Sequence, residues 1–133
     1  MDLSALRSAV AEQVATSTEY LCYDRLSEPM QPPCVVVGRA TVRPHHTFGA
    51  AGYDEAELGV WIIGKRAGAA AEEWLDEATQ RVRLALEADQ TFDDQCTTSW
   101  LADDGIRPGD VQIGDVGLPA VELAVMVLGA KPS

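Results

Sequence analysis

The feature that most constrains the fold is the segment from Glu57 to Leu86, where an apolar strand leads directly into a long helix. Side chains alternate between the two faces of an extended chain, and residues 58–63 are apolar on both faces. Leu58, Val60 and Ile62 share one face, and Trp61 and Ile63 share the other. Both faces therefore need cover, which is typical of a strand in the interior of a sheet.

The helix expected after this strand supplies cover for one of these faces. Its apolar residues recur at helical spacing, and mostly charged residues occupy the positions between them. The apolar positions are Trp74, Leu75, Ala78, Val82, Ala85 and Leu86. Strand and helix together are expected to form the platform of the fold.

Further elements flank this platform. Asp2 can cap a helix that ends near residues 16–18. Strands are expected at residues 20–23, 34–43, 96–101, 111–116 and 119–128, with turns at 103–105 and 108–109. The last strand is apolar on both faces and is expected beside the strand at 58–63. This order predicts a single α+β domain over residues 1–133, with a mixed or antiparallel sheet of about five to six strands and two helices on one face.

Composition narrows the class of protein. The chain has 133 residues, 47% of them hydrophobic, which suits one domain with its own core. A net charge of -11 argues against a surface that wraps nucleic acid, because phosphate binding needs a basic face. The charge is uneven, since residues 67–133 contain thirteen acidic and four basic residues. One side of the molecule is therefore expected to be strongly acidic.

Three cysteines at wide spacing, Cys22, Cys34 and Cys96, make a poor disulfide framework and favour a reducing compartment. They are expected to be small buried residues. The chain does not begin with a basic stretch followed by an apolar run, and no apolar stretch approaches the length of a membrane span. We therefore expect a cytoplasmic origin and no membrane association.

Residues 59–65 match the phosphate-loop pattern G-x-x-x-x-G-K, but the next residue and the middle of the pattern do not suit phosphate binding. Arg66 replaces the serine or threonine that would hold magnesium. Residues 60–63 are strand formers, whereas a phosphate cradle needs a loop with converging N–H groups. The pattern therefore predicts a buried strand rather than a nucleotide site.

Other candidate chemistry is equally weak. His45 and His46 are adjacent, so on an extended backbone they point to opposite sides, and no third metal ligand lies at a recognisable spacing. No cysteine has the basic surroundings of a nucleophilic thiolate. The pairs at 93–94 and 103–104 fit turns better than a calcium or glycosidase site. No catalytic residue, metal site or cofactor is predicted.

Taken in order, the features of the chain resemble the small tail terminator (tail completion) proteins of long-tailed phages, particularly those that infect actinobacteria. The resemblance covers nearly the whole chain and lies in order and spacing, not in a catalytic signature. The features are a Leu3-x-x-Leu6 helix, Tyr20-Leu21-Cys22-Tyr23-Asp24, prolines ahead of Cys34-Val35-Val36-Val37, the strand Gly59 to Ile63, and the helix motifs Glu72-x-x-Leu75-Asp76 and Val82-x-x-Ala85-Leu86.

The resemblance implies a structural and non-enzymatic role in the virion, at the head-proximal end of the tail, after assembly in the host cytoplasm. Copies of the chain would form a hexameric ring that caps the tail tube, stops its polymerisation and meets the head-tail connector or stopper. DNA would only pass through the lumen. Alternatives are another neck, connector or minor tail protein, and more distantly a small ligand- or metal-binding domain using His45 and His46.

A ring of identical copies needs two different patches that meet head to tail. Residues 44–56 are aperiodic and are expected to form a loop, and the part of it from Pro44 to Tyr53 is the candidate for a subunit or tube interface. The candidate interface residues are Arg43, His45, His46, Phe48 and Tyr53, with Phe48 as the apolar contact. An acidic lumen would repel passing DNA. The candidates for this lumen or for a partner face are Asp93, Asp94, Asp103, Asp104 and Asp110.

Overall fold

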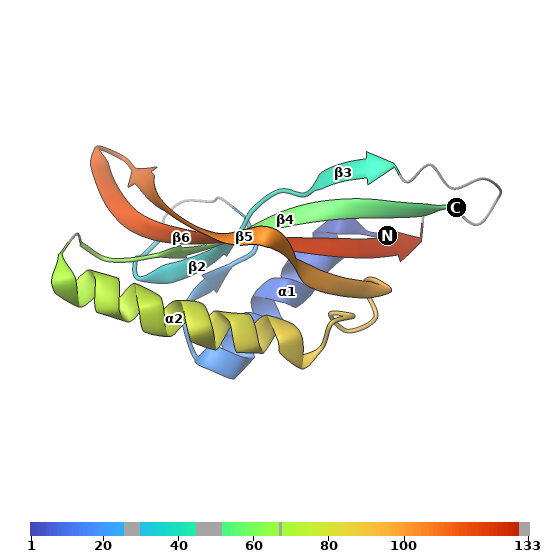
Figure 1. Ribbon diagram of the computed structural model, residues 1–133, viewed down its shortest axis with the longest axis horizontal. Helices are drawn as coiled ribbons and strands as arrows, with labels where there is room; N and C mark the ends of the chain where they lie inside the picture. Colours follow the sequence, from blue (N-terminus) through green and yellow to red (C-terminus); the bar gives the residue numbers. More distant parts are fainter. Residues whose placement is uncertain (26–29, 45–51, 67, 131–133) are drawn as a thin grey trace.

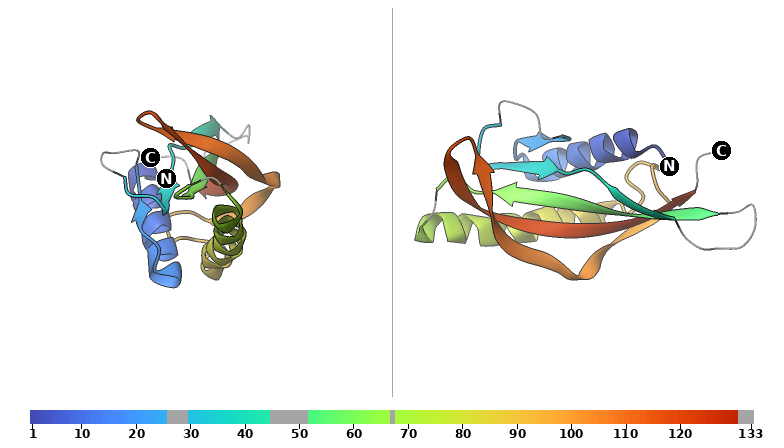
Figure 2. Two further views of the ribbon diagram at one scale, coloured as in Figure 1. Left: turned by 90° about the vertical axis from the view of Figure 1, so that its left-hand side faces the viewer. Right: turned by 90° about the horizontal axis from the view of Figure 1, so that it is seen from above.

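Two helices and six strands account for most of the described chain in the computed structural model, which describes residues 1–25, 30–44, 52–66 and 68–130. In chain order they are α1 (Leu3–Thr18), β1 (Cys22–Tyr23), β2 (Cys34–Val37), β3 (Thr41–Pro44), β4 (Tyr53–Ile63), α2 (Ala69–Ala88), β5 (Thr98–Ile113) and β6 (Val116–Ala130). Both helices lie on the same side of one sheet (Figures 1 and 2). This arrangement confirms the predicted α+β fold.

The sheet has the strand order β1-β2-β4-β6-β5, and β3 pairs with the first part of β4. β1 runs parallel to β2, while every other pairing among the described strands is antiparallel, so the sheet is mixed. β4 and β6 pair without interruption from Tyr53↔Ala130 to Ile63↔Ala120. The predicted position of the last strand beside the strand at 58–63 is therefore confirmed.

The face of the sheet that carries the helices holds the main core. Alternation along β4 turns Ala56, Leu58, Val60 and Ile62 toward the helices, and all four are fully buried. They pack with Leu6, Val10 and Val14 of α1, with Leu75, Ala78 and Val82 of α2, and with Leu123, Val125 and Val127 of β6. The amphipathic pattern of the sequence thus places both helices on this one face.

The two helices are joined by specific contacts as well as by the core. α1 begins where the Asp2 carboxylate accepts a hydrogen bond from the Ala5 N–H at 3.0 Å, which confirms the predicted cap. Beyond its C-terminus, the Tyr20 ring lies 5.4 Å from that of Trp74 on α2. The Arg81 guanidinium lies over the same Tyr20 ring and donates to the Thr18 carbonyl at 3.3 Å.

Part of the opposite face is covered by the chain itself. Residues 110–119, here called the hairpin arm, extend beyond the part of β6 that pairs with β4 and curl over this face toward β2 (Figure 1). Val111, Ile113 and Leu118 of the arm pack near Cys34 and Val36 in a second apolar cluster. The arm therefore buries the outward side chains of β2, which explains why all four residues of β2 are buried.

Three sequence predictions about β5 and β6 were wrong in detail. The stretches at 103–105 and 108–109 are not turns, because β5 runs through both. Residues between Leu101 and Ile106 form a β-bulge instead, and bulges use the same small and polar residues as turns. The chain reverses at Gly114 and Asp115, inside the strand predicted at 111–116, where Gly114 has φ of 62°.

The strand predicted at 34–43 is interrupted, since residues 38–40 separate β2 from β3. The loop predicted from Pro44 to Ala56 is wrong at both ends, because Pro44 belongs to β3 and residues 53–56 belong to β4. Its residues 45–51 lie outside the described part of the chain. The two strands flanking them form an antiparallel pair.

Replacing Gly105 with alanine is expected to destabilise the protein by about 1–3 kcal/mol, because an added methyl group has no space there. Its Cβ would lie 2.6 Å from the Ala102 carbonyl oxygen and 3.1 Å from that of Ala124, and both are backbone atoms. Urea unfolding followed by circular dichroism measures the effect.

Gly117→Ala in the same hairpin is the matched control. No atom lies within 4 Å of its Cβ position, so the free energy of unfolding should change by less than about 0.5 kcal/mol. Equal effects of the two substitutions would contradict the role assigned to the bulge.

Candidate interaction surfaces

The sheet face turned away from the helices, here called the helix-free face, carries the described part of the predicted interface. Arg43 of β3 is exposed and pairs with Glu55 of β4. Tyr53 begins β4, shares the parity of Glu55, and leaves 40% of its surface exposed. The structure therefore brings Arg43 and Tyr53 onto one face of the sheet. His45, His46 and Phe48 lie outside the described residues.

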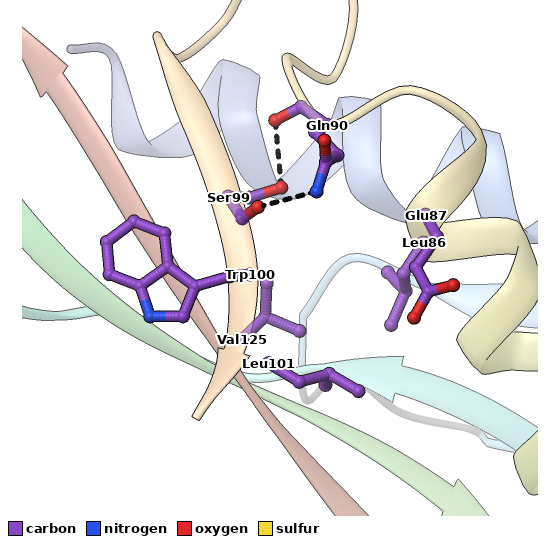
Figure 3. A pocket seen from close by; sticks show the side chains of 7 residues that line it. All are labelled: Leu86, Glu87, Gln90, Ser99, Trp100, Leu101 and Val125. Carbon is purple, nitrogen blue, oxygen red and sulfur yellow. Dashed lines mark hydrogen bonds between the residues drawn. The ribbon is translucent and has the colours of Figure 1, made fainter. Parts of the chain in front are cut away.

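An exposed tryptophan on this face was missed by the sequence analysis. Trp100 pairs with Met126 of β6 and is 41% exposed. Its indole lies on the opposite side of β5 from the helix residues (Figure 3). The alternation of polar and apolar residues at 99 and 100 places Ser99 and Trp100 on opposite faces of the strand. Which of the two is exposed depends on the face that the helices cover, and the structure exposes Trp100.

A hollow of about 300 Å³ lies on the helix-free face between the β2–β3 segment and β6. Gly59 and Ala124 are among its apolar lining residues, and Arg39, Glu57, Trp61 and Glu122 contribute the larger side chains. The Glu122 carboxylate is held by Arg107 at 3.3 Å. Among the described residues, Arg39 and Arg43 form no ion pair, so both guanidinium groups remain available to a partner.

The predicted acidic residues lie on two separate elements. Asp93 and Asp94 follow α2, whereas Asp103 and Asp104 lie in the bulge of β5 and Asp110 lies on the hairpin arm. Residues 69–97 contain eight acidic and two basic residues, so α2 and its following turn hold a net charge of -6 out of -11. The acidity is therefore concentrated beside the helices, and the role of these residues as a lumen or partner face stays a prediction.

The turn after α2 is organised by Asp89. Its carboxylate accepts hydrogen bonds from the Asp93 N–H at 3.0 Å, the Thr91 hydroxyl at 2.7 Å and the Thr91 N–H at 3.0 Å. These bonds, led by that from Asp93, lower the pKa of the Asp89 carboxyl. They hold residues 92–94 in the left-handed region, with φ between 48° and 61°, and Phe92 is fully buried. The turn thus holds Asp93 and Asp94 out at the surface.

A cavity of about 20 Å³ lies between the end of α2 and β5, which is room for about one water molecule (Figure 3). The Ser99 hydroxyl donates to the Gln90 carbonyl at 2.8 Å, and the Gln90 amide donates to the Ser99 carbonyl at 3.1 Å. The residues around it are Leu86, Glu87, Gln90, Ser99, Trp100, Leu101 and Val125. This reciprocal pair fastens the helix to the sheet edge, and the cavity is too small for an organic ligand.

The cysteines are thiols in apolar surroundings. Cys34 and Cys96 are buried and Cys22 is half-buried, and all three are free. Burial raises the pKa of Cys22 and of Cys96 to about 11 and also raises that of Cys34. Thiols with such pKa values stay protonated at neutral pH, so the expected packing role fits these residues better than nucleophilic catalysis.

The remaining sequence candidates are resolved by the backbone. Residues 59–63 of the phosphate-loop pattern lie in β4 and pair with β6, so they form no loop. Within the described ranges no three His, Cys, Asp or Glu side chains are grouped as metal ligands would be. In the same ranges no helix is long and apolar enough to cross a membrane.

Comparison with solved structures shows a clear similarity of fold. No protein-family model matches the chain, and no curated protein matches it. Among solved structures, the chain is similar to a chain of the virion of a native gene transfer agent particle, with a TM-score of 0.61 and 15% sequence identity. The similarity covers 95% of each chain. At this identity the similarity shows a shared fold over that part of both chains.

Replacing Asp89 with asparagine should lower the thermal midpoint at pH 7, because the variant loses a charged acceptor for the N–H and hydroxyl donors of the turn. A carboxyl whose folded pKa is lowered stabilises the fold above its ordinary value of 3.8, and this stabilisation is lost as the pH falls through the folded pKa. The two midpoints should therefore converge at lower pH in calorimetry.

Asp94→Asn is the matched control, since no hydrogen bond to the Asp94 side chain exists among the described residues and asparagine tolerates its backbone conformation. Its midpoint should follow that of the unmodified protein at both pH values. A loss equal to that of Asp89→Asn would contradict the organising role of Asp89.

Proposed function

We propose that this chain is a structural, non-enzymatic protein of a phage-like virion. The observation that carries the proposal is the shared fold with a chain of the gene transfer agent virion over 95% of both chains. Two unrelated domains often match over a common core only, whereas here neither chain has a large unmatched part. The helix-free face, with its exposed Trp100 and two arginines that form no ion pair within the described residues, offers a surface for other subunits.

More narrowly, we propose a tail terminator. The order of features along the chain resembles that family, and the stretches that carry the resemblance lie in or next to α1, β1, β2, β4 and α2. Six copies would form a ring on the head-proximal end of the tail tube. The ring would contact the tube protein on one side and the head-tail connector or stopper on the other, while DNA passes through its lumen.

The acidity of the chain supports this role in one respect. A net charge of -11 disfavours retention of a passing polyanion, and residues 69–97 hold more than half of it. If these residues face the lumen, they repel phosphate during DNA ejection. If they face outward, they offer a surface to a basic partner. Assembly therefore decides which function the acidic turn performs.

Mixing the purified protein with tail tubes assembled from the tube protein of the same phage tests the proposal. Negative-stain electron microscopy should show a ring at one end of each tube, and capped tubes should stop growing when more tube protein is added. Tubes that stay bare and keep growing, with the protein bound to the head-side connector instead, would favour a neck protein over a terminator.

A further inference from the structure

Each edge of the sheet leaves a strand without a partner among the described residues. On one side β5 pairs only with β6, and on the other β3 pairs only with β4. β1 occupies the outer edge of β2, so on that side the segment from Arg39 through β3 remains open. On the β5 side residues 98–109 lie at the edge of the main sheet, and residues 98–105 are the part that lies level with β3.

These two open segments lie at the same level of the sheet. Pairing across the strands places Arg43, Glu55, Leu128 and Thr98 in one row. The next row on the same face contains Thr41, Glu57, Met126 and Trp100.

A third row joins the segment before β3 to the bulge of β5. Gly38 donates from its N–H to the Gly59 carbonyl, and Gly59 pairs with Ala124. The Ala124 carbonyl in turn lies 3.1 Å from the Cβ position of Gly105. Arg39 therefore stands level with Asp103 and Asp104 at the other edge.

The chemistry of the two segments is complementary. One edge presents Arg39 and Arg43, both exposed and without an ion-pair partner among the described residues. The other presents Asp103 and Asp104, also exposed, beside Trp100. Tryptophan is favoured at the centre of interfaces and attracts guanidinium groups over its ring. If these rows continue into a neighbouring copy, the indole of Trp100 lies between Arg39 and Arg43 of that copy.

We propose that the sheet continues from one copy of this chain to the next, with β3 of one copy paired to Thr98–Leu101 of β5 in its neighbour. Arg39 of the first copy then meets Asp103 and Asp104 of the second. β3 runs antiparallel to β4, β4 to β6 and β6 to β5, so β3 and β5 run in opposite directions. Copies placed side by side with their helices on the same side thus pair antiparallel, with ordinary ladder geometry.

The two edges are different surfaces, so the contact is heterologous and repeats from copy to copy until a ring closes. This inference deepens the proposed ring and rests on it. It assigns the ring interface to the sheet edges and leaves the helices on one side of a continuous sheet.

Cysteine cross-linking tests the pairing directly. Arg43 and Thr98 occupy the same row, so side chains at these positions in neighbouring copies would have Cβ atoms about 4.5–5.5 Å apart. The doubly substituted Arg43→Cys, Thr98→Cys protein, treated with a short bismaleimide, should give a ladder of covalent oligomers. Each single variant should give dimers at most. In the control pair Ser17→Cys, Thr98→Cys, one cysteine lies at an exposed position of α1, away from the proposed contact. Equal ladders from the two pairs, or none from either, would overturn the proposal.

Charge complementation separates this inference from the proposed function. Arg39→Glu alone and Asp103→Lys, Asp104→Lys alone each place like charges at the contact, which should weaken capping of tubes by about tenfold or more. An equimolar mixture of the two variants should restore capping, because alternating copies recover opposite charges at every contact in an even-numbered ring. Leu84→Ala, on the exposed side of α2, should leave capping unchanged.

The outcomes are distinct. Unmodified protein that fails to cap tubes contradicts the terminator role, while the cross-linking ladder still reports on the edge pairing. Unmodified protein that caps tubes, together with charge variants that cap equally well or a mixture that does not recover, contradicts the edge pairing alone.

Discussion

The uninterrupted pairing of β4 with β6 is the interaction on which the rest of the structure depends. Because the ladder runs from Tyr53↔Ala130 to Ile63↔Ala120 without a bulge, the alternation of both strands stays in phase over its whole length. One face is therefore apolar enough to hold both helices, and the other keeps Glu55, Glu57 and Glu122. A slip by one residue would exchange the two faces. Every assignment of a side chain to the core or to a partner follows from this register.

Much of the fold could be predicted from the sequence, because its central elements are strongly periodic. The strand at 58–63, the helix that follows it and the Asp2 cap are local patterns, and the structure contains all three. The errors occur where the same residue types are common in two different local structures. Asp103-Asp104-Gly105 fits a turn or a bulge equally well, and only the partner strand decides between them. The reversal at Gly114 was hidden for the same reason.

The surfaces were harder to predict than the fold, because they depend on strand order. Arg43 and Tyr53 were identified from their place at the ends of a predicted loop, and only the pairing of β3 with β4 shows that they share one face. Trp100 and Arg39 gained significance only once β5 and β3 were known to lie at opposite edges. The candidate acidic residues were predicted as one group, yet Asp93 and Asp94 follow α2 whereas the other three belong to β5. Their closeness in the sequence did not reveal this division between two elements.

The curled hairpin arm also bears on how the protein avoids aggregation. A long flat edge strand is a template for indiscriminate pairing with other chains. Here β5 has sixteen residues, but its edge is interrupted by the bulge between Leu101 and Ile106 and by Pro108, and Val111 and Ile113 pack near β2 beyond the main sheet. On the other side β1 occupies the edge of β2. The segments left open are short and flanked by charges, which disfavours indiscriminate pairing with other chains.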